Sequence, residues 1–205
     1  MKPAIAATIF ASIATVGATA IVTAPAAAQT GTGQIGMRGF VSARCGVNGE
    51  SGASTAFSGT ISLGELSDAE ARLRSALINS TSGSPAGTIA FQAGCTGTAA
   101  TVTLSATRLS TPSPVAAAEG TVGSNDIDYT AQIAMALTGG GITTLNYTTA
   151  ATLPAPSTIA VTDGFAYVPD NFEIRTFGFR PEGGNDSFLV AGNYDAVITV
   201  TITPS

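Results

Sequence analysis

The sequence predicts an all-β protein, built as a single antiparallel β-sandwich domain. First, apolar residues alternate with polar ones through many short segments that are rich in Thr, Val, Ile and aromatic residues. This is the pattern of half-buried strands. Second, clusters of Gly, Pro, Ser and Asn, such as TSGSPAG and PEGGND, separate these segments. Third, no period of about 20–50 residues repeats, which disfavours a solenoid or a propeller.

The beginning of the chain is predicted to be a secretory signal peptide. Lys2 precedes an apolar run, and Ala26 and Ala28 have the spacing of an A-x-A cleavage site, which predicts a cut after Ala28. A membrane anchor is the alternative, but Pro25 interrupts the run just before the cleavage site. No later stretch is apolar for long enough to span a bilayer. We therefore expect an exported mature chain, residues 29–205, with no membrane anchor.

Strands are expected along the whole mature chain, wherever the alternation is clearest. Their ranges are 35–41, 87–95, 101–106, 127–137, 157–161, 172–179 and 191–205. Each should bury one face, as in 127–137, where the apolar face carries Ile127, Tyr129, Ala131, Ile133 and Met135.

One segment has a different pattern and predicts a short helix or helical turn over 66–77. Ser67 and Glu70 have the spacing of a capping box, and Leu73 and Leu77 follow at positions i and i+4. An exposed loop that only resembles a helix is the alternative.

The composition of the mature chain argues against catalysis and against nucleic acid. It contains no Lys, His or Trp, and the full chain has a net charge of −5. Without a basic patch, neither nucleic acid nor an anionic membrane is an expected partner. The commonest general acid–base group is absent, and no serine lies in a G-x-S-x-G motif. We therefore expect neither an enzyme nor a bound cofactor.

Two groups of residues leave weaker alternatives open. Asp126 and Asp128 could bind calcium or act on a glycoside, but neither has supporting ligands nearby, so a solvated loop and no metal site are the better interpretation. The tyrosines could stack on sugars or belong to the core; these are Tyr129, Tyr147, Tyr167 and Tyr194.

The two cysteines, Cys45 and Cys95, are interpreted as a disulfide, because an even pair in an exported protein favours one. The bridge would close a loop of about 50 residues, worth roughly 4 kcal/mol in the chain-entropy model. Zinc would need more ligands, and a thiol nucleophile would lack an imidazole partner.

The two ends of the mature chain complement each other. Ile35, Met37, Gly39 and Val41 alternate just before the first cysteine, and residues 191–205 end the sequence as an alternating strand with an apolar face. Such a strand needs a neighbour on its other side. Pairing within one chain would complete the domain, whereas pairing between chains would build a fibre.

The stretches GQIGMRGFVSARCGV, GTISLGEL, TIAFQAGC and AGNYDAVITVTITP, in this order and spacing, resemble the spore coat protein U-type domain. That domain occurs in the major subunits of archaic chaperone–usher pili. The resemblance covers essentially the whole mature chain. It implies an incomplete immunoglobulin-like β-sandwich that lacks its last strand and is completed by a donor strand from a neighbouring subunit.

The resemblance also implies a domain organisation and residue roles. Residues 1–28 would be the removed signal peptide, 29–43 the donor segment and 44–205 the pilin domain. The implied donor positions are Ile35, Met37, Gly39 and Val41, the implied groove residues are Ile198, Val200 and Ile202, and the implied disulfide is Cys45–Cys95.

The implied function is that of a structural subunit of a surface pilus, exported through the periplasm and supporting adhesion or biofilm formation. Its partners would be identical or related subunits in a head-to-tail polymer, a periplasmic chaperone and an outer-membrane usher. The alternative is a secreted, self-contained sandwich that serves as a coat component or as a carbohydrate-binding adhesin. In that alternative, residues 33–42 pair with their own chain.

Overall fold

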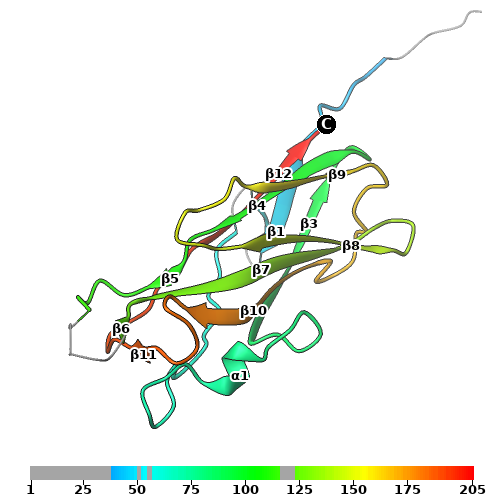
Figure 1. Ribbon diagram of the computed structural model, residues 1–205. Coiled ribbons are helices and arrows are strands. Elements are labelled where there is room, and N and C mark those ends of the chain that lie inside the picture. The colour runs from blue at the N-terminus through cyan, green and yellow to red at the C-terminus, as the bar shows by residue number, and fades with distance from the viewer. Residues whose placement is uncertain (1–37, 50–51, 55–56, 116–122) are drawn as a thin grey trace, which may run out of the picture. The chain divides into compact units, whose positions relative to one another are not determined.

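The computed structural model describes residues 38–49, 52–54, 57–115 and 123–205 (Figure 1). Phe40–Ser205 form one compact unit. Of the other unit, Met1–Gly39, only Arg38 and Gly39 are described, and both are exposed. The predicted signal peptide and the donor positions Ile35 and Met37 lie outside the described residues.

The secondary structure of the described chain is mostly antiparallel β-strand with almost no helix, which confirms the predicted all-β class. Its largest sheet has the order β2 (Gly52–Ser54), β1 (Cys45–Gly49), β3 (Gly87–Cys95), β10 (Phe172–Pro181), β7 (Asp126–Ala136), β5 (Leu109–Ser110), with β8 (Ile142–Thr148) also paired to β7. A second sheet has the order β12 (Ile198–Pro204), β4 (Ala100–Ala106), β9 (Ser157–Val161). A short parallel pair joins β11 (Phe188–Leu189) to β6 (Gly123–Ser124).

The centre of the large sheet consists of β3, β10 and β7, whose apolar residues lie opposite one another. Ile174 of β10 is paired with Ile89 of β3 on one side and with Ile133 of β7 on the other. Phe172 lies in the same way between Phe91 and Met135. These cross-strand rows form a buried face, because side chains two apart along a strand share one face.

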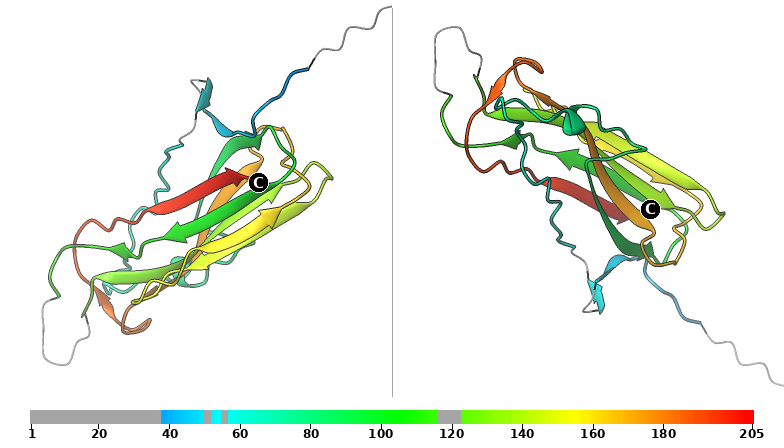
Figure 2. Two further views of the ribbon diagram at one scale, coloured as in Figure 1. Left: turned by 90° about the horizontal axis from the view of Figure 1, so that it is seen from above. Right: turned by 90° about the horizontal axis from the view of Figure 1, so that it is seen from below.

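The smaller sheet contributes to the same hydrophobic core through its central strand. Val102 and Leu104 of β4 are fully buried in the cluster that also contains Ile133 and Phe172. Strand β12 lies along one edge of β4, with Ile198 opposite Ala106 at the start of the pairing (Figure 2). Strand β9 lies along the other edge of β4. One hydrophobic cluster thus contains residues from both antiparallel sheets.

The predicted capping box does not form. The Ser67 hydroxyl donates to the Glu65 carboxylate at 2.8 Å, and Asp68 Oδ1 instead accepts the backbone N–H groups of Glu70 and Arg72. A short polar side chain that binds backbone groups in this way favours a turn over a helix. The prediction of a helix start at Ser67 was therefore wrong.

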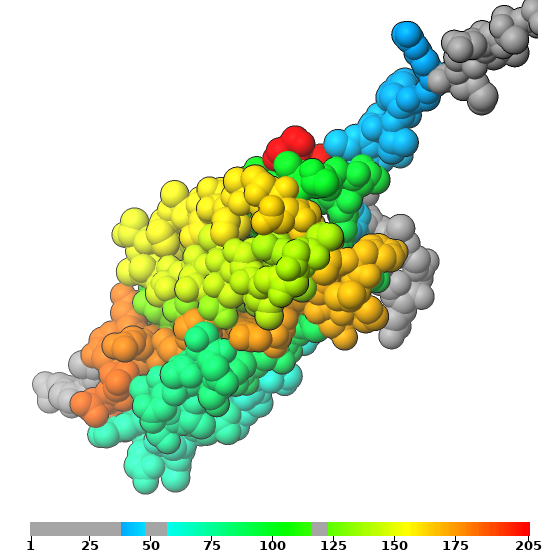
Figure 3. Space-filling view, turned by 90° about the vertical axis from the view of Figure 1, so that its right-hand side faces the viewer, coloured from blue at the N-terminus to red at the C-terminus, as the bar shows by residue number. Residues whose placement is uncertain are grey.

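A helical turn, α1 (Ser75–Ile78), follows this loop, so the expected helical structure is present but shorter than predicted. Leu73 and Leu77 are both buried. The loop and α1 lie against the segment that carries β10 and β11 (Figure 3), where the Ser80 hydroxyl accepts the Gly178 N–H at 3.0 Å. Apolar contacts, rather than the cap, position this segment.

Candidate functional site: an apolar groove beside β12

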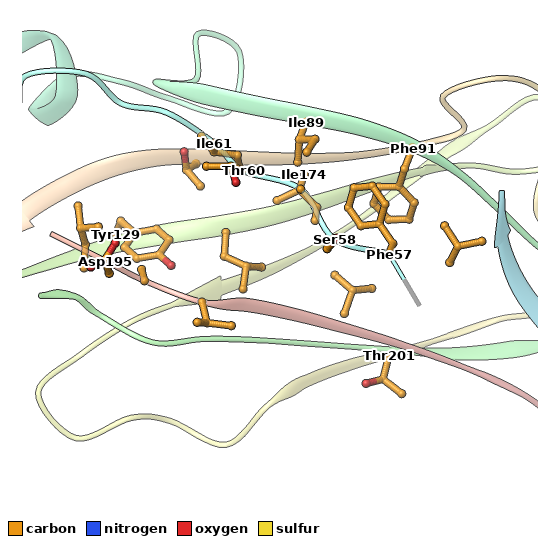
Figure 4. A pocket seen from close by; sticks show the side chains of 18 of the residues that line it. Phe57, Ser58, Thr60, Ile61, Ile89, Phe91, Tyr129, Ile174, Asp195 and Thr201 are labelled. Carbon is orange, nitrogen blue, oxygen red and sulfur yellow. The ribbon is translucent and has the colours of Figure 1, made fainter. Parts of the chain in front are cut away.

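A groove of about 820 Å³ lies between strand β12 and the strands β3 and β10 of the large sheet (Figure 4). Its lining is mainly apolar and comes from both sheets and from the segment 57–63. Elongated apolar grooves of this kind bind an extended chain segment when one wall is a sheet edge. The groove is therefore the candidate functional site.

One wall is the inward face of β12, which carries the predicted groove residues Ile198, Val200 and Ile202. All three are only partly buried, while the threonines between them are exposed. In the adjacent strand, Val102 and Leu104 are completely buried. The predicted alternation in β12 is thus present, but its apolar face lacks the cover that the neighbouring strand has.

Strand β12 is also an edge strand in the described part of the chain. It pairs over its whole length with β4, from Ile198 opposite Ala106 to Pro204 opposite Ala100. No described strand pairs with its other edge. Its backbone N–H and C=O groups on that side can therefore accept a further strand.

The opposite wall is the segment 57–63, which runs along β3 from Phe91 toward Gly87 without forming a strand. The ring of Phe57 stacks on Phe91 with centroids 4.4 Å apart. A Cβ at Gly59 would overlap the end of the Ile89 side chain, so a larger residue here would require that side chain to move. We did not predict this wall, although the alternation of Phe57, Gly59, Ile61 and Leu63 is a signal that could have found it.

The lining of the groove includes polar groups at the end where β12 begins. Tyr129 and Asp195 lie there, whereas Phe57 and Phe91 lie toward the other end (Figure 4). The Tyr129 side chain is only 3% exposed, and its hydroxyl has no hydrogen-bond partner among the described residues. Burial, with a smaller effect of Tyr147, raises the pKa of Tyr129 well above its ordinary value.

The predicted disulfide is confirmed, and it lies at the edge of the groove. Cys45 and Cys95 are directly opposite each other in β1 and β3, with their Cα atoms 4.0 Å apart. Just before Cys45, the Arg44 N–H donates to Thr96 Oγ1 at 2.9 Å, and that hydroxyl donates to the Ser42 carbonyl. The disulfide is consistent with an extracellular or periplasmic protein.

The chain ahead of this anchor is exposed where the structure describes it. Phe40 and Val41 are 92% and 84% exposed, and a Cβ at Gly39 would have nothing within 4 Å. The strand predicted over 35–41 is absent from its described part, 38–41. The physical reason is that a strand needs a neighbour to satisfy its backbone hydrogen bonds, and this stretch has none.

The aspartates Asp126 and Asp128 have a cation partner from the chain itself. The Arg108 guanidinium is 2.8 Å from Asp128 and 3.4 Å from Asp126, and it also binds Glu182. Both aspartates lie in β7, so the expected solvated loop was wrong, and with Arg108 they form an ion-pair cluster at the start of this strand. No group of three or more potential metal-binding side chains occurs within the described ranges.

The tyrosines mostly belong to the core rather than to a sugar-binding surface. Tyr129 and Tyr147 are buried, and Tyr194 is partly buried with its hydroxyl bonded to two backbone carbonyls. Only Tyr167 among these four is exposed.

Comparisons with protein-family models, with curated proteins and with solved structures found no match. Within the part of the chain that the structure describes, no helix has the length and apolar character needed to cross a membrane.

Proposed function

We propose that this protein is a structural subunit of a surface pilus, assembled by donor-strand exchange on the chaperone–usher route. In this proposal the domain is an incomplete immunoglobulin-like β-sandwich, and the groove beside β12 accepts residues 35–41 of the next subunit. A chaperone would fill the groove in the periplasm, and an usher would catalyse the exchange. The fibre would support adhesion or biofilm formation.

The observation that carries the proposal is the half-exposed apolar face of β12 beside an unpaired edge. Ile198, Val200 and Ile202 would become buried if one strand were added there. The donor segment is long enough to pair with the whole of β12. Strand β12 has seven residues, and residues 35–41 are also seven, so both extend about 23 Å at roughly 3.3 Å per residue.

The donor segment also has a defined end. Hydrogen bonds to Thr96 fix the chain at Ser42 and Arg44, while Val41 and Phe40 are exposed. The exchanged segment would therefore end at Val41 and be joined to its own domain through a short anchored linker. Gly39 would allow the backbone to approach the groove closely at one position.

Strand direction favours pairing between chains over pairing within one chain. The amino end of β1 and the carboxyl end of β12 lie at the same end of the domain (Figure 1). A chain that folded back from Ser42 into its own groove would run parallel to β12. The existing pairings of β12 with β4 and of β4 with β9 are antiparallel, and purely antiparallel sheets are over-represented. A strand from another copy can enter in the antiparallel direction.

The test is a deletion of residues 29–41 in the native host, with unboiled and boiled surface extracts compared on a denaturing gel. We expect the wild type to show a ladder that boiling collapses, and the deletion to abolish it.

A matched pair of variants separates the two faces of the donor. Ile35→Asp with Met37→Asp should prevent the ladder, because both charges would enter an apolar groove. Gln34→Asp with Arg38→Asp adds two carboxylates on the other face and should retain it.

A wild-type chain that runs as a monomer with and without boiling would contradict the proposal. The self-contained secreted sandwich would then be the better account, with residues 33–42 pairing with their own chain.

A further inference from the structure

The hydroxyl of Tyr129 differs from those of two neighbouring tyrosines in having no partner. Tyr147 donates to the Pro154 carbonyl at 2.9 Å, and Tyr194 donates to the Ser124 and Val190 carbonyls at 3.0 and 2.9 Å. The Tyr129 hydroxyl is buried and binds no described residue. A buried hydroxyl without a partner is disfavoured, so each such group needs an explanation.

The position of Tyr129 supplies the explanation. Its ring stacks on Phe179 with centroids 5.4 Å apart, and both residues line the groove. Figure 4 shows the Tyr129 side chain among the lining residues at the end near Asp195. Because burial raises the pKa of Tyr129, its hydroxyl keeps its proton. It can therefore donate a hydrogen bond, and what it lacks is an acceptor.

The proposed donor segment creates a need for such a contact. Ile35, Met37, Gly39 and Val41 all face one side, and none has a polar side chain. A slip by one residue would turn them away from the groove, but a slip by two residues keeps the same face inward. The apolar walls alone discriminate weakly between these registers. A hydrogen bond to the backbone at Gly39 would be lost on such a slip, because Met37 or Val41 would take the place of Gly39 and its side chain would separate the backbone from the hydroxyl.

We propose that the Tyr129 hydroxyl donates a hydrogen bond to an oxygen acceptor on the strand that fills the groove, and that this contact fixes the register of that strand. The occupant is the N-terminal segment, residues 29–41, of a second copy of this chain. The acceptor is a main-chain carbonyl beside Gly39, the inward position of residues 35–41 that has no side chain. This inference rests on the proposed function and makes Tyr129 a positioning residue in the acceptor groove.

The experiment uses the chain 29–205 as a monomer, a synthetic peptide of residues 29–41, and the variant Tyr129→Phe. Without the peptide, the melting temperature of the variant should equal or exceed that of the wild type, because an unpaired hydroxyl has been removed. The peptide should bind the variant about tenfold more weakly than it binds the wild type, as expected for one lost hydrogen bond. Tyr147→Phe is the matched control: it should lower the melting temperature and leave the peptide affinity unchanged.

Register is measured with a photo-crosslinking residue in place of Ile35 in the peptide. The wild type should give crosslinks at one site. Tyr129→Phe should add a second site displaced by two residues, which a purely structural tyrosine would not produce.

Two different failures can be distinguished. If the peptide binds both proteins equally and in one register, or if Tyr129→Phe lowers the melting temperature as much as Tyr147→Phe, the role of Tyr129 is overturned while the proposed function stands. If the peptide does not bind the wild type and no heat-sensitive polymer forms, the proposed function fails and this inference fails with it.

Discussion

Removing the disulfide should destabilise the protein by an amount that follows from the position of the bridge in the chain. The variant is Cys45→Ala with Cys95→Ala. The two residues are separated by 50 positions, and closing a loop of that length in the unfolded chain removes about 4 kcal/mol of conformational freedom. For a domain of this size, 1 kcal/mol corresponds to a shift of about 2–4 °C in melting temperature. We therefore expect a loss of about 8–16 °C.

The measurement is thermal and denaturant unfolding of the oxidised wild type, the reduced wild type and the double variant. Reduction should shift the wild type by about as much as the substitutions do, and a reductant should leave the double variant unchanged. Alanine is a suitable replacement because both cysteines are only partly buried, which keeps the cavity effect small. A shift below about 3 °C would refute the reasoning, since the crosslink would then not restrict the unfolded chain.

Three further outcomes are expected. Val200→Thr should weaken subunit polymerisation by about 1–3 kcal/mol per contact, because a hydroxyl would be buried in the filled groove. The control is Thr199→Val, on the exposed face of the same strand. Equal effects of the two substitutions would contradict the assignment of Val200 to the groove face. Gly39→Leu should leave the melting temperature of the monomer unchanged, because a Cβ there meets nothing within 4 Å. The same substitution should reduce polymer formation. A gel ladder like that of the wild type would argue against a close approach of the donor backbone to the groove at this position. Above about pH 10, where tyrosine ionises in the unfolded chain, stability should fall progressively, because burial raises the pKa of Tyr129 in the folded state. Urea titrations at several alkaline pH values should show a smaller fall for Tyr129→Phe, and an identical fall would assign the effect to other groups.

The predictions from sequence succeeded where an alternating pattern coincides with a paired strand. Strand β3 has the predicted bounds, and β4, β7, β9 and β10 lie within a residue or two of theirs. Strand β12 begins later than predicted, at Ile198. The segment before it contains an isolated bridge between Asp195 and Ser110 and then leaves the ladder. Alternation therefore identifies a strand better than it identifies where pairing starts.

Other elements could not be predicted because distant residues determine them. The capping-box pattern at Ser67 was overridden by the Asp68 side chain, which binds the backbone two and four residues later. Buried Asn171 closes one end of the large sheet by binding both the N–H and the carbonyl of Ala93. Neither contact has a signature in sequence spacing, since one depends on a local competition and the other joins residues far apart in the chain.

The candidate groove was predicted in part. Ile198, Val200 and Ile202 share the face of β12 that lines the groove, because strand periodicity determines which residues share a face. That they accept a donor strand stays a prediction. The opposite wall and the polar end with Tyr129 were missed. Tyr129 had been assigned to an apolar strand face, and nothing in its sequence neighbourhood indicates that its hydroxyl lacks an acceptor.

The disulfide has a mechanical consequence in a fibre of the proposed kind. Tension would enter each subunit through the linker at Ser42 and reach Cys45 a few residues later, where a covalent bond transfers it to Cys95 in β3. The short strand β1 would thus be protected from being peeled away. At the other end, a donor strand that lies along β12 would be pulled parallel to its own length. Its backbone hydrogen bonds would then carry the load together in shear, whereas a hairpin pulled at one end breaks one bond at a time.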